Sequence, residues 1–458
     1  MEKHHHHERS TFSGKLGFVL SAAGASVGLG NIWRFPYLAA KYGGGIFLLI
    51  YIILALTFGY SMIIAETALG RMTRKSPVGA FGKFGKSKWL SFGGWINAVI
   101  PILIVPYYSV IGGWVIKYLI EYVKGNSQKL AEDGYFSAFI SDGTSTEICF
   151  LVFALLTLAI IFAGVRNGVE RVSKFMMPIL VFLSVLIAIY SVTRPGALAG
   201  VKYFLVPNPA NFSWMTVVAA MGQMFYSLSI AMGILVTFGS YMKRDVSIEG
   251  STTNVEIFDT AIAIMAGLMI IPAVFAFSGG DPDTLQAGPA LMFITIPKVF
   301  ANMGFGTPIG IFFFLLVLMA ALTSSIALTE SAVSTFQDEL RWPRKGATVI
   351  VGIIMVILGS LSSLGYGPLA FVKIIGMQFL DFFDFLTNSV MMPIAAFATC
   401  ILISRVIGVG KIEEEVEADG GSFKRKKVFR FMIRYLCPIF AVIILLSSVA
   451  NAFGWISM

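Results

Sequence analysis

Residues 24–31 have the sequence GASVGLGN and interrupt an apolar run that extends over residues 14–41. Glycine weakens a helix, and a helix that unwinds inside lipid frees backbone N–H and C=O groups that need new partners. This stretch alone leaves two interpretations open. Gly24 and Gly28 match the G-x-x-x-G spacing of closely packed membrane helices, or the chain unwinds here and offers backbone groups to a ligand.

A second interruption favours the ligand interpretation. Residues 227–233 have the sequence SLSIAMG, small and hydroxyl-rich, inside the apolar run over residues 213–240. Each interruption opens a group of five apolar runs, and corresponding breaks in two halves of a chain are typical of a transporter site between inverted repeats. Exposed carbonyl oxygens suit a cation there, and helix N-termini suit an anion. A carboxylate and a sodium ion could bind without a buried charged side chain.

The composition places these runs in a membrane. Of 458 residues, 57% are hydrophobic and 13% are charged, about half the charged share of a soluble domain, and the mean hydropathy is +0.81. A soluble, disordered or fibrous protein is therefore excluded. We predict an all-α polytopic membrane protein with eleven transmembrane helices in a 5+5 inverted repeat, helices 1 and 6 being discontinuous. The other runs are 45–70, 90–124, 147–163, 170–192, 256–279, 308–336, 346–363, 380–407 and 431–455.

We expect two repeats followed by one further helix. Repeat 1 covers residues 14–192, repeat 2 covers 213–407, a solvated cytoplasmic loop covers 408–430, and helix 11 lies in 431–458. Residues 1–13 are expected to form a cytoplasmic N-terminal segment. Its run His4–His7 is interpreted as a tag remnant and is left out of the fold prediction.

The 34 Lys and Arg residues indicate the orientation. Most of them fall on one side when the N-terminus is placed in the cytoplasm, as the positive-inside rule requires. An odd number of spans then puts the C-terminus outside, in a multi-pass protein of the cell membrane. The net charge of +9 is interpreted as basic loops facing anionic lipid, so we expect the lipid bilayer as a partner and no nucleic acid.

Few residues suit catalysis or a structural metal. Cys149, Cys400 and Cys437 lie far apart in the sequence without a C-x-x-C pair, so a zinc site and a disulfide framework are both unexpected. The only histidines are those of the terminal run, which removes the commonest general base. We therefore expect that the protein is not an enzyme.

Hydroxyl and charged side chains inside the spans are candidate functional groups. Thr323, Ser324 and Ser325 follow one another in the eighth run. They either bond back to carbonyl groups of their own helix or serve as hard oxygen ligands for a small cation. Charged side chains are costly in lipid and so indicate functional sites, although a residue at a helix end can reach water. Those in or near the runs are Arg34, Glu66, Asp259, Glu330, Asp338, Asp381 and Asp384.

Several motifs together resemble those of the neurotransmitter:sodium symporter family. The first run carries GLGNIWRFPY at residues 28–37, followed by Gly43-Gly44-Gly45. The resemblance continues in order along nearly the whole chain, at Glu66, Gly70-Arg71, Tyr107-Tyr108, residues 168–171 (GVER), Met177-Pro178, Gly222-Gln223, residues 322–325 (LTSS), residues 338–340 (DEL) and Arg434-Tyr435. It implies a bacterial amino-acid transporter with the fold of the leucine transporter, driven by sodium through alternating access.

The resemblance also implies two sodium ions, both held by oxygen donors, and no organic cofactor. The first site maps onto Ser26, Asn31, Ser227 and Asp259. The second maps onto backbone carbonyls of Gly24, Val27 and Ala320 and hydroxyls of Thr323 and Ser324. Many relatives have Asn where this chain has Asp259, together with a chloride ion nearby, and Tyr51 and Gln223 match neighbours of that chloride. A fixed carboxylate could replace the anion, so the resemblance implies transport that is independent of chloride.

The implied substrate is an amino acid, because monoamine-transporting relatives have Asp where this chain has Gly28. Its carboxylate would meet the backbone of Gly28, Leu29 and Gly30, the Tyr108 hydroxyl and the first sodium ion. The other residues expected around it are Ser26, Ile104, Tyr226, Ser227, Ser229, Met232, Ser324 and Leu328. The mostly apolar lining favours a hydrophobic or aromatic side chain, to which the flexible Met232 can adapt.

Two gates are implied as well. The outer gate resembles Arg34 with Asp384, covered by Tyr108 and Tyr226, and Asp381 is a competing partner. The inner gate resembles Arg9 with Asp338, supported by Phe12, Tyr241 and Glu330. Many family members have a twelfth helix that this sequence lacks, so a monomer is a possible state. A sodium-dependent amino-acid sensor or channel that uses the same pocket is the alternative function.

Overall fold

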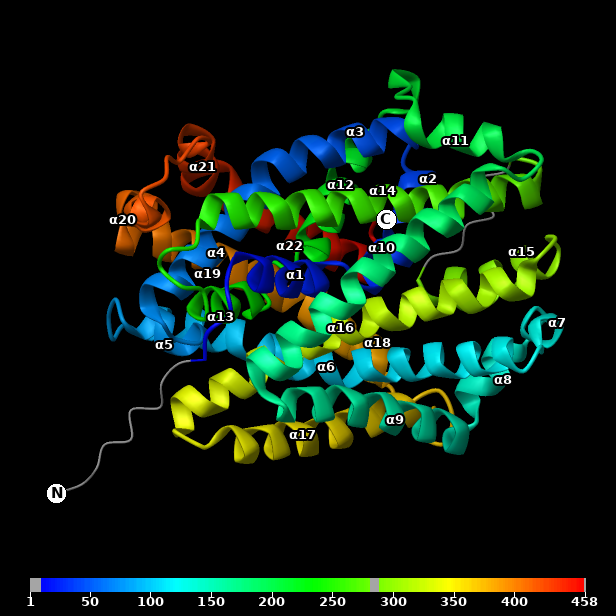
Figure 1. Ribbon diagram of the computed structural model, residues 1–458, viewed down its shortest axis with the longest axis horizontal. Coiled ribbons are helices and arrows are strands. Elements are labelled where there is room, and N and C mark those ends of the chain that lie inside the picture. The colour runs from blue at the N-terminus through cyan, green and yellow to red at the C-terminus, as the bar shows by residue number, and fades with distance from the viewer. Residues whose placement is uncertain (1–9, 281–287, 457–458) are drawn as a thin grey trace.

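The computed structural model describes residues 10–280 and 288–456. Within these ranges the chain is helical, and β pairing is limited to one bridge between Ile374 and Met377. Most of the long helices run roughly along the long axis of the molecule (Figure 1). The predicted all-α architecture is confirmed.

Nine helical segments in the described part of the chain are long and apolar enough to cross a membrane. They are α3–η2–α4 (Gly45–Thr73), α6 (Lys88–Val123), α9 (Gly143–Phe162), η3–α10 (Val165–Val192), α14 (Ile248–Ser278), α16 (Gly306–Leu340), α17 (Arg344–Leu364), α18–η7–α19–η8 (Phe379–Ile407) and α21–η10–α22 (Lys426–Ala452). A tenth, α1 (Lys15–Ser26) with η1–α2 (Gly30–Lys41), meets the same criteria as a bent pair. The run over residues 213–240 is divided between α12 (Trp214–Ser227) and α13 (Ile234–Ser240), neither of which is long enough alone. The count of eleven spans therefore stays a prediction.

Short helices connect the spans. They are α5 (Pro77–Gly82), α7 (Ser127–Leu130), α8 (Tyr135–Ser141), α11 (Ala197–Leu205), η4 (Pro209–Asn211), η6 (Leu291–Thr295), α15 (Ile296–Ala301), α20 (Val409–Val416) and η9 (Glu417–Asp419).

Both interruptions of the apolar pattern coincide with helix ends. Helix α1 ends at Ser26, and the helix that begins at Gly30 is inclined to it by 55°. Between α12 and α13, Ser229 and Ala231 have φ angles of 53° and 59°. A left-handed conformation costs about 1–3 kcal/mol for a residue other than glycine, so the surroundings must hold this segment in place. The Glu66 carboxylate does so in part, because it accepts a hydrogen bond from the Ala231 N–H at 2.8 Å.

The two breaks lie in the middle of the molecule. Helix α1 packs against α14 and α16, while α13 packs against α4 and α16 packs on α6. Figure 1 shows α1 and α13 near the centre, with α14 on one side and α16 and α6 on the other. The packing therefore surrounds the unwound backbone with long helices that can supply side-chain partners.

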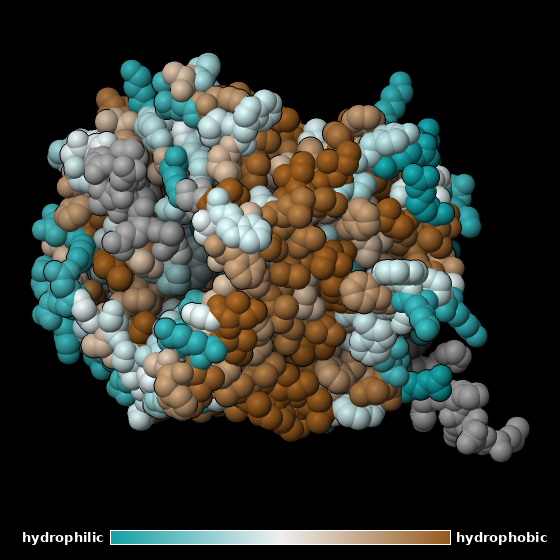
Figure 2. All heavy atoms as spheres, turned by 180° about the vertical axis from the view of Figure 1, so that it is seen from behind, coloured by the Kyte–Doolittle hydropathy of each residue, from teal (hydrophilic) through white to brown (hydrophobic). Residues whose placement is uncertain are grey.

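The outside of the helices is apolar where a membrane would surround it. Figure 2 shows a broad hydrophobic band across the molecule, with hydrophilic residues gathered towards both ends. Large apolar side chains such as Leu155, Phe175, Phe182 and Leu446 are exposed by 64–69%. An exposed apolar area of this extent is expected of a protein whose solvent is the bilayer core.

The segment predicted as a solvated cytoplasmic loop over residues 408–430 contains α20, η9 and the start of α21, and parts of it dock on the spans, while its cytoplasmic position stays a prediction. Arg71 on α4 is fully buried, and its Nε lies 2.6 Å from a Glu415 oxygen on α20. Arg425 pairs with Glu256 on α14 at 2.8 Å. Charged residues of this segment serve as ion-pair partners, both for residues from distant parts of the chain and for one another, as in Arg430 with Glu413.

Candidate functional site

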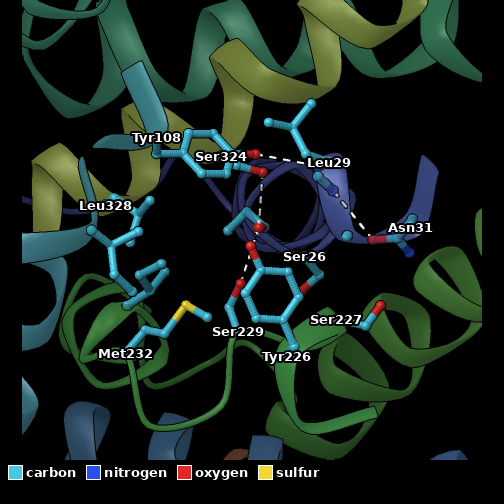
Figure 3. A pocket seen from close by; sticks show the side chains of 15 residues that line it. Ser26, Leu29, Asn31, Tyr108, Tyr226, Ser227, Ser229, Met232, Ser324 and Leu328 are labelled. Atoms are coloured by element: carbon cyan, nitrogen blue, oxygen red, sulfur yellow. Dashed lines mark hydrogen bonds between the residues drawn. The ribbon is translucent and has the colours of Figure 1, made fainter. Parts of the chain in front are cut away.

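A cavity lies where the two breaks meet. The residues that line it are Ala25, Ser26, Gly28, Leu29, Gly30, Asn31, Ile104, Tyr108, Tyr226, Ser227, Ser229, Met232, Ile234, Ser324 and Leu328. All residues expected around the substrate are on this wall (Figure 3). Ala25 and Ile234 were not foreseen, since no motif singles out an apolar residue next to a break. The substrate roles of these residues stay predictions.

The cavity has one polar and one apolar end. Figure 3 shows Met232 and Leu328 on one side and Asn31 and Ser227 on the opposite side. At the polar end, the Tyr108 hydroxyl accepts a hydrogen bond from the Leu29 N–H at 3.3 Å. Backbone N–H groups and a hydroxyl at the start of a helix can hold a carboxylate. The arrangement fits a small molecule with an anionic end and an apolar end.

Gly28 is needed at the polar end because its surroundings leave no room for a side chain. A Cβ atom built on Gly28 would lie 2.7 Å from the Ser324 Oγ and 3.0 Å from the Tyr108 Oη. The space for water-sized molecules in the cavity is about 30 Å³, which holds about two water molecules. A large amino acid therefore fits only when the cavity walls move apart. Met232 and Tyr226 are the long side chains of the wall that can rotate to make this space.

Asp259 is a fully buried carboxylate beside the cavity. It accepts hydrogen bonds from Asn31 Nδ2 at 2.9 Å, Ser227 Oγ at 2.9 and 3.0 Å, and Tyr51 Oη at 3.3 Å. No Lys or Arg of the described residues forms an ion pair with Asp259. An ionised carboxylate is costly to bury without a cation. The surroundings of Asp259 therefore suit a bound cation, and its role as a sodium ligand stays a prediction.

The hydroxyl groups of α16 meet the break in α1. Thr323 Oγ1 donates to the Ala320 carbonyl at 3.1 Å, within its own helix. Ser324 Oγ instead crosses to α1 and lies 3.2 Å from the Gly24 carbonyl oxygen and 3.1 Å from that of Ala25. Thr323 therefore bonds back within its own helix, Ser324 bonds to the broken end of α1, and their role as cation ligands stays a prediction.

The residues assigned to the second sodium site are close in space. A Cβ atom built on Gly24 would lie 3.1 Å from the Thr323 Cβ. Val27, three residues after Gly24, is the C-cap of α1. Ser325 is not part of this group, because its hydroxyl pairs with Thr157 on α9 at 3.0 Å.

The outer gate pair is not in direct contact. Among the described residues Arg34 forms no ion pair, and its guanidinium lies 5.4 Å from the centre of the Tyr226 ring. Asp384 receives hydrogen bonds from Tyr107 at 3.3 Å and Asn388 at 2.5 Å, and it is close enough to Arg34 for an electrostatic interaction.

The two acidic candidates for this gate differ in their partners. Asp381 accepts a hydrogen bond from Tyr366 at 2.9 Å. Asp384 is thus the better placed partner for Arg34. The Tyr107 contact could have been suspected from the Tyr107-Tyr108 motif, whereas no pattern indicated Asn388.

The inner gate can be described only in part, because Arg9 lies outside the described residues. Asp338 accepts a hydrogen bond from the Ser76 N–H at 2.6 Å. Phe12 packs edge-to-face on Tyr241, with ring centres 5.9 Å apart, and the Tyr241 hydroxyl donates to Glu330 at 2.7 Å.

Glu330 has a basic partner that sequence reasoning missed. Arg344 at the start of α17 donates to it at 2.9 Å through Nη1. The charge of Arg344 was visible in the sequence, but its distance from Glu330 depends on how α16 and α17 turn back on each other.

Comparisons with known proteins agree with this geometry. The sequence profile described as "Sodium:neurotransmitter symporter family" matches residues 9–131 and 136–454. A sodium-dependent transporter of Bacillus subtilis, YhdH, is 34% identical over 96% of this chain and 97% of its own length. The sodium- and chloride-dependent GABA transporter 2 of Mus musculus is 27% identical over 90% of this chain and 75% of its own.

A solved structure is also similar. The crystal structure of MhsT in complex with L-phenylalanine is 35% identical in sequence and superposes with a TM-score of 0.84, over 96% of this chain and 100% of MhsT. The match spans both helix breaks and the helices that surround them. This chain belongs to the sodium:neurotransmitter symporter family.

Proposed function

We propose that this protein is a sodium-coupled symporter of hydrophobic or aromatic amino acids that works by alternating access and does not need chloride. The observation that carries the proposal is the cavity between the two helix breaks, polar at one end and apolar at the other. The similar MhsT was crystallised with L-phenylalanine, a molecule with those two ends. Oxygen donors beside the cavity suit sodium as the co-transported ion.

Coupling would arise at the polar end. The substrate carboxylate binds at the backbone of Gly28–Gly30 and the Tyr108 hydroxyl, and the first sodium ion binds among Ser26, Asn31, Ser227 and Asp259. Since the ion and the carboxylate have opposite charges and adjacent positions, each strengthens the binding of the other. The Asp259 carboxylate supplies the negative charge that chloride provides in some relatives, which supports independence from chloride.

The second sodium ion would link α1 to α16. Its ligands are the carbonyls of Gly24, Val27 and Ala320 with the hydroxyls of Thr323 and Ser324. Binding requires the Ser324 hydroxyl to turn its hydrogen away from the Gly24 carbonyl, to which it now donates. The ion therefore replaces a hydrogen bond with a stronger electrostatic link and favours one arrangement of the two helices.

Transport would follow from closing one gate and opening the other. Arg34 and Asp384 would meet directly as the outer gate closes, and the contacts of Phe12, Tyr241 and Asp338 would separate as the inner gate opens. The two five-helix repeats, 14–192 and 213–407, move relative to each other, with the N-terminus in the cytoplasm, the C-terminus outside and a monomer as the working unit. The sodium gradient drives the cycle because each state binds the ions with a different affinity.

The test is uptake of radiolabelled amino acids into proteoliposomes with an inward sodium gradient and gluconate in place of chloride. We expect uptake of phenylalanine or leucine that falls at least about tenfold when potassium replaces sodium, since no other gradient then drives it. Sodium-dependent binding without uptake would contradict symport and favour the sensor. Uptake that requires chloride would contradict the role given to Asp259.

Replacement of Thr323 by valine is expected to lower the apparent sodium affinity roughly tenfold, because one oxygen ligand of the second ion is lost. The half-saturating sodium concentration for uptake should rise accordingly, and it is measured from initial uptake at a series of sodium concentrations. Thr329→Val is the matched control, since Thr329 lies buried on the same helix and its hydroxyl donates to the Ser325 carbonyl of that helix at 2.7 Å. An equal loss in both variants would contradict a specific role for Thr323.

A further inference from the structure

Three sulfur atoms from three helices meet in the interior. Met62 lies on α4, Cys400 on α19 and Cys437 at the start of α22. The Cys400 thiol donates to the Met62 sulfur at 3.6 Å, and the Cys437 side chain is a neighbour of Cys400. All three side chains are at most 1% exposed, and the thiols are free. Helix packing alone creates the cluster, because Met62 and Cys400 are 338 positions apart.

The ligand set suits a soft cation of low coordination number. In the described ranges no group of three or more His, Cys, Asp and Glu side chains is arranged to hold a metal ion, so a four-coordinate zinc site is not available here. Thiol and thioether sulfurs select ions such as Cu⁺ and bind hard ions such as sodium poorly. The sulfur cluster is therefore distinct in chemistry from the sodium sites.

A π-helical stretch lies beside each cysteine in the chain, although both cysteines are in α-helix. The π-helical stretch η8 (Leu402–Ile407) begins just after Cys400, and η10 (Met432–Leu436) ends immediately before Cys437. π-helical turns inside α-helices occur frequently at functional sites. Among the spans in the described residues, the segment Lys426–Ala452 is also the least buried inside the protein, since only 28% of its most apolar stretch is buried.

We propose that Cys400, Cys437 and Met62 form a binding site for a soft monovalent cation, Cu⁺ or its redox-stable analogue Ag⁺. One thiol releases its proton to water when the ion binds, and the other thiol and the thioether bind without losing one. The occupied site then carries no net charge, as a position inside the membrane requires.

Occupation of this site would restrain the helix that supports the broken segment. Met62 lies one turn before Glu66 on α4, and Glu66 holds the Ala231 N–H. An ion at Met62 would join α4 to α19 and α22. If the proposed symport requires α4 to move relative to those helices, the bound ion inhibits uptake, and this part of the inference rests on the proposed function.

The binding test uses the purified full chain in nitrate buffer without chloride, titrated with Ag⁺ in a calorimeter. We expect one Ag⁺ per chain in Cys149→Ala, in which the thiol remote from the cluster, itself a soft ligand, is removed, and the variants below are made in this background. The double variant Cys400→Ala/Cys437→Ala should bind at least about 100-fold more weakly, because thiolate is the preferred ligand of a soft ion. X-ray absorption of the bound silver should show sulfur neighbours alone.

Met62→Leu provides a second measurement if the double variant does not fold. Leucine conserves the side-chain volume, so the helix packing should persist. We expect affinity for Ag⁺ to fall about tenfold, as one weak ligand is lost. Unchanged affinity in this variant, equal binding by the double variant, or oxygen or nitrogen neighbours in the absorption spectrum would each overturn the site.

Uptake then tests the coupling to transport separately. In proteoliposomes Ag⁺ should inhibit sodium-driven uptake by the Cys149→Ala protein and leave the Cys400→Ala/Cys437→Ala protein unaffected. Binding without inhibition would overturn the restraint on α4 while the site stands. If neither protein takes up amino acids before Ag⁺ is added, the proposed symport fails, and the calorimetric result still decides the metal site.

Discussion

Replacement of Asp259 by asparagine is expected to lower sodium-driven uptake in chloride-free buffer by about 100-fold, the factor that corresponds to roughly 3 kcal/mol for removing one partner of a buried charge pair. Asparagine keeps the size of the side chain, so the change isolates the charge. The measurement is initial uptake of the radiolabelled substrate at several sodium concentrations, which should show a raised half-saturating sodium concentration.

The same variant should recover part of its activity when chloride is added. Tyr51, Ser227 and Asn31 donate hydrogen bonds to Asp259 and would remain free to turn towards an anion. Glu147→Gln is the matched control, because Glu147 is a carboxyl group in a span, bonded by Ser360 and not in the cavity wall. Full activity of Asp259→Asn without chloride would show that the carboxylate does not serve the sodium site.

Replacement of Gly28 by alanine is expected to weaken substrate binding by at least about 100-fold. The added methyl group would enter the space between the Ser324 Oγ and the Tyr108 Oη, only 2.7 Å from the former. Overpacking of a closed site costs about 1–3 kcal/mol, and the methyl group also occupies the position proposed for the substrate carboxylate. Binding of radiolabelled phenylalanine to purified protein in saturating sodium measures the effect.

Gly346→Ala is the control for the Gly28 variant. A Cβ on Gly346 would have its nearest neighbour, Pro343, at 3.8 Å, so alanine fits there in ordinary contact. Both variants should unfold at temperatures close to that of the parent protein in the absence of substrate. The position of the carboxylate site would be wrong if Gly28→Ala bound phenylalanine as tightly as Gly346→Ala does.

Composition and local pattern were enough to predict the class of the molecule and the two stretches between which the cavity lies. Long apolar runs are a local property that needs a membrane, and the glycine-rich and hydroxyl-rich stretches at residues 24–31 and 227–233 weaken the helix wherever the rest of the chain folds. The helix ends at Ser26 and Ser227 follow from that composition. The cavity residues could be listed because they cluster around these two stretches and a recognisable family pattern.

Which other distant side chains meet depends on the tertiary structure. Arg71 pairs with Glu415, 344 positions away, and Glu330 is bonded by Arg344 from the start of the next helix. Nothing local to Cys400 or Cys437 indicates that their side chains are neighbours. Such contacts depend on the crossing and rotation of whole helices, which are set by packing against several neighbours at once. Helical periodicity along one run carries no information about which other run it faces.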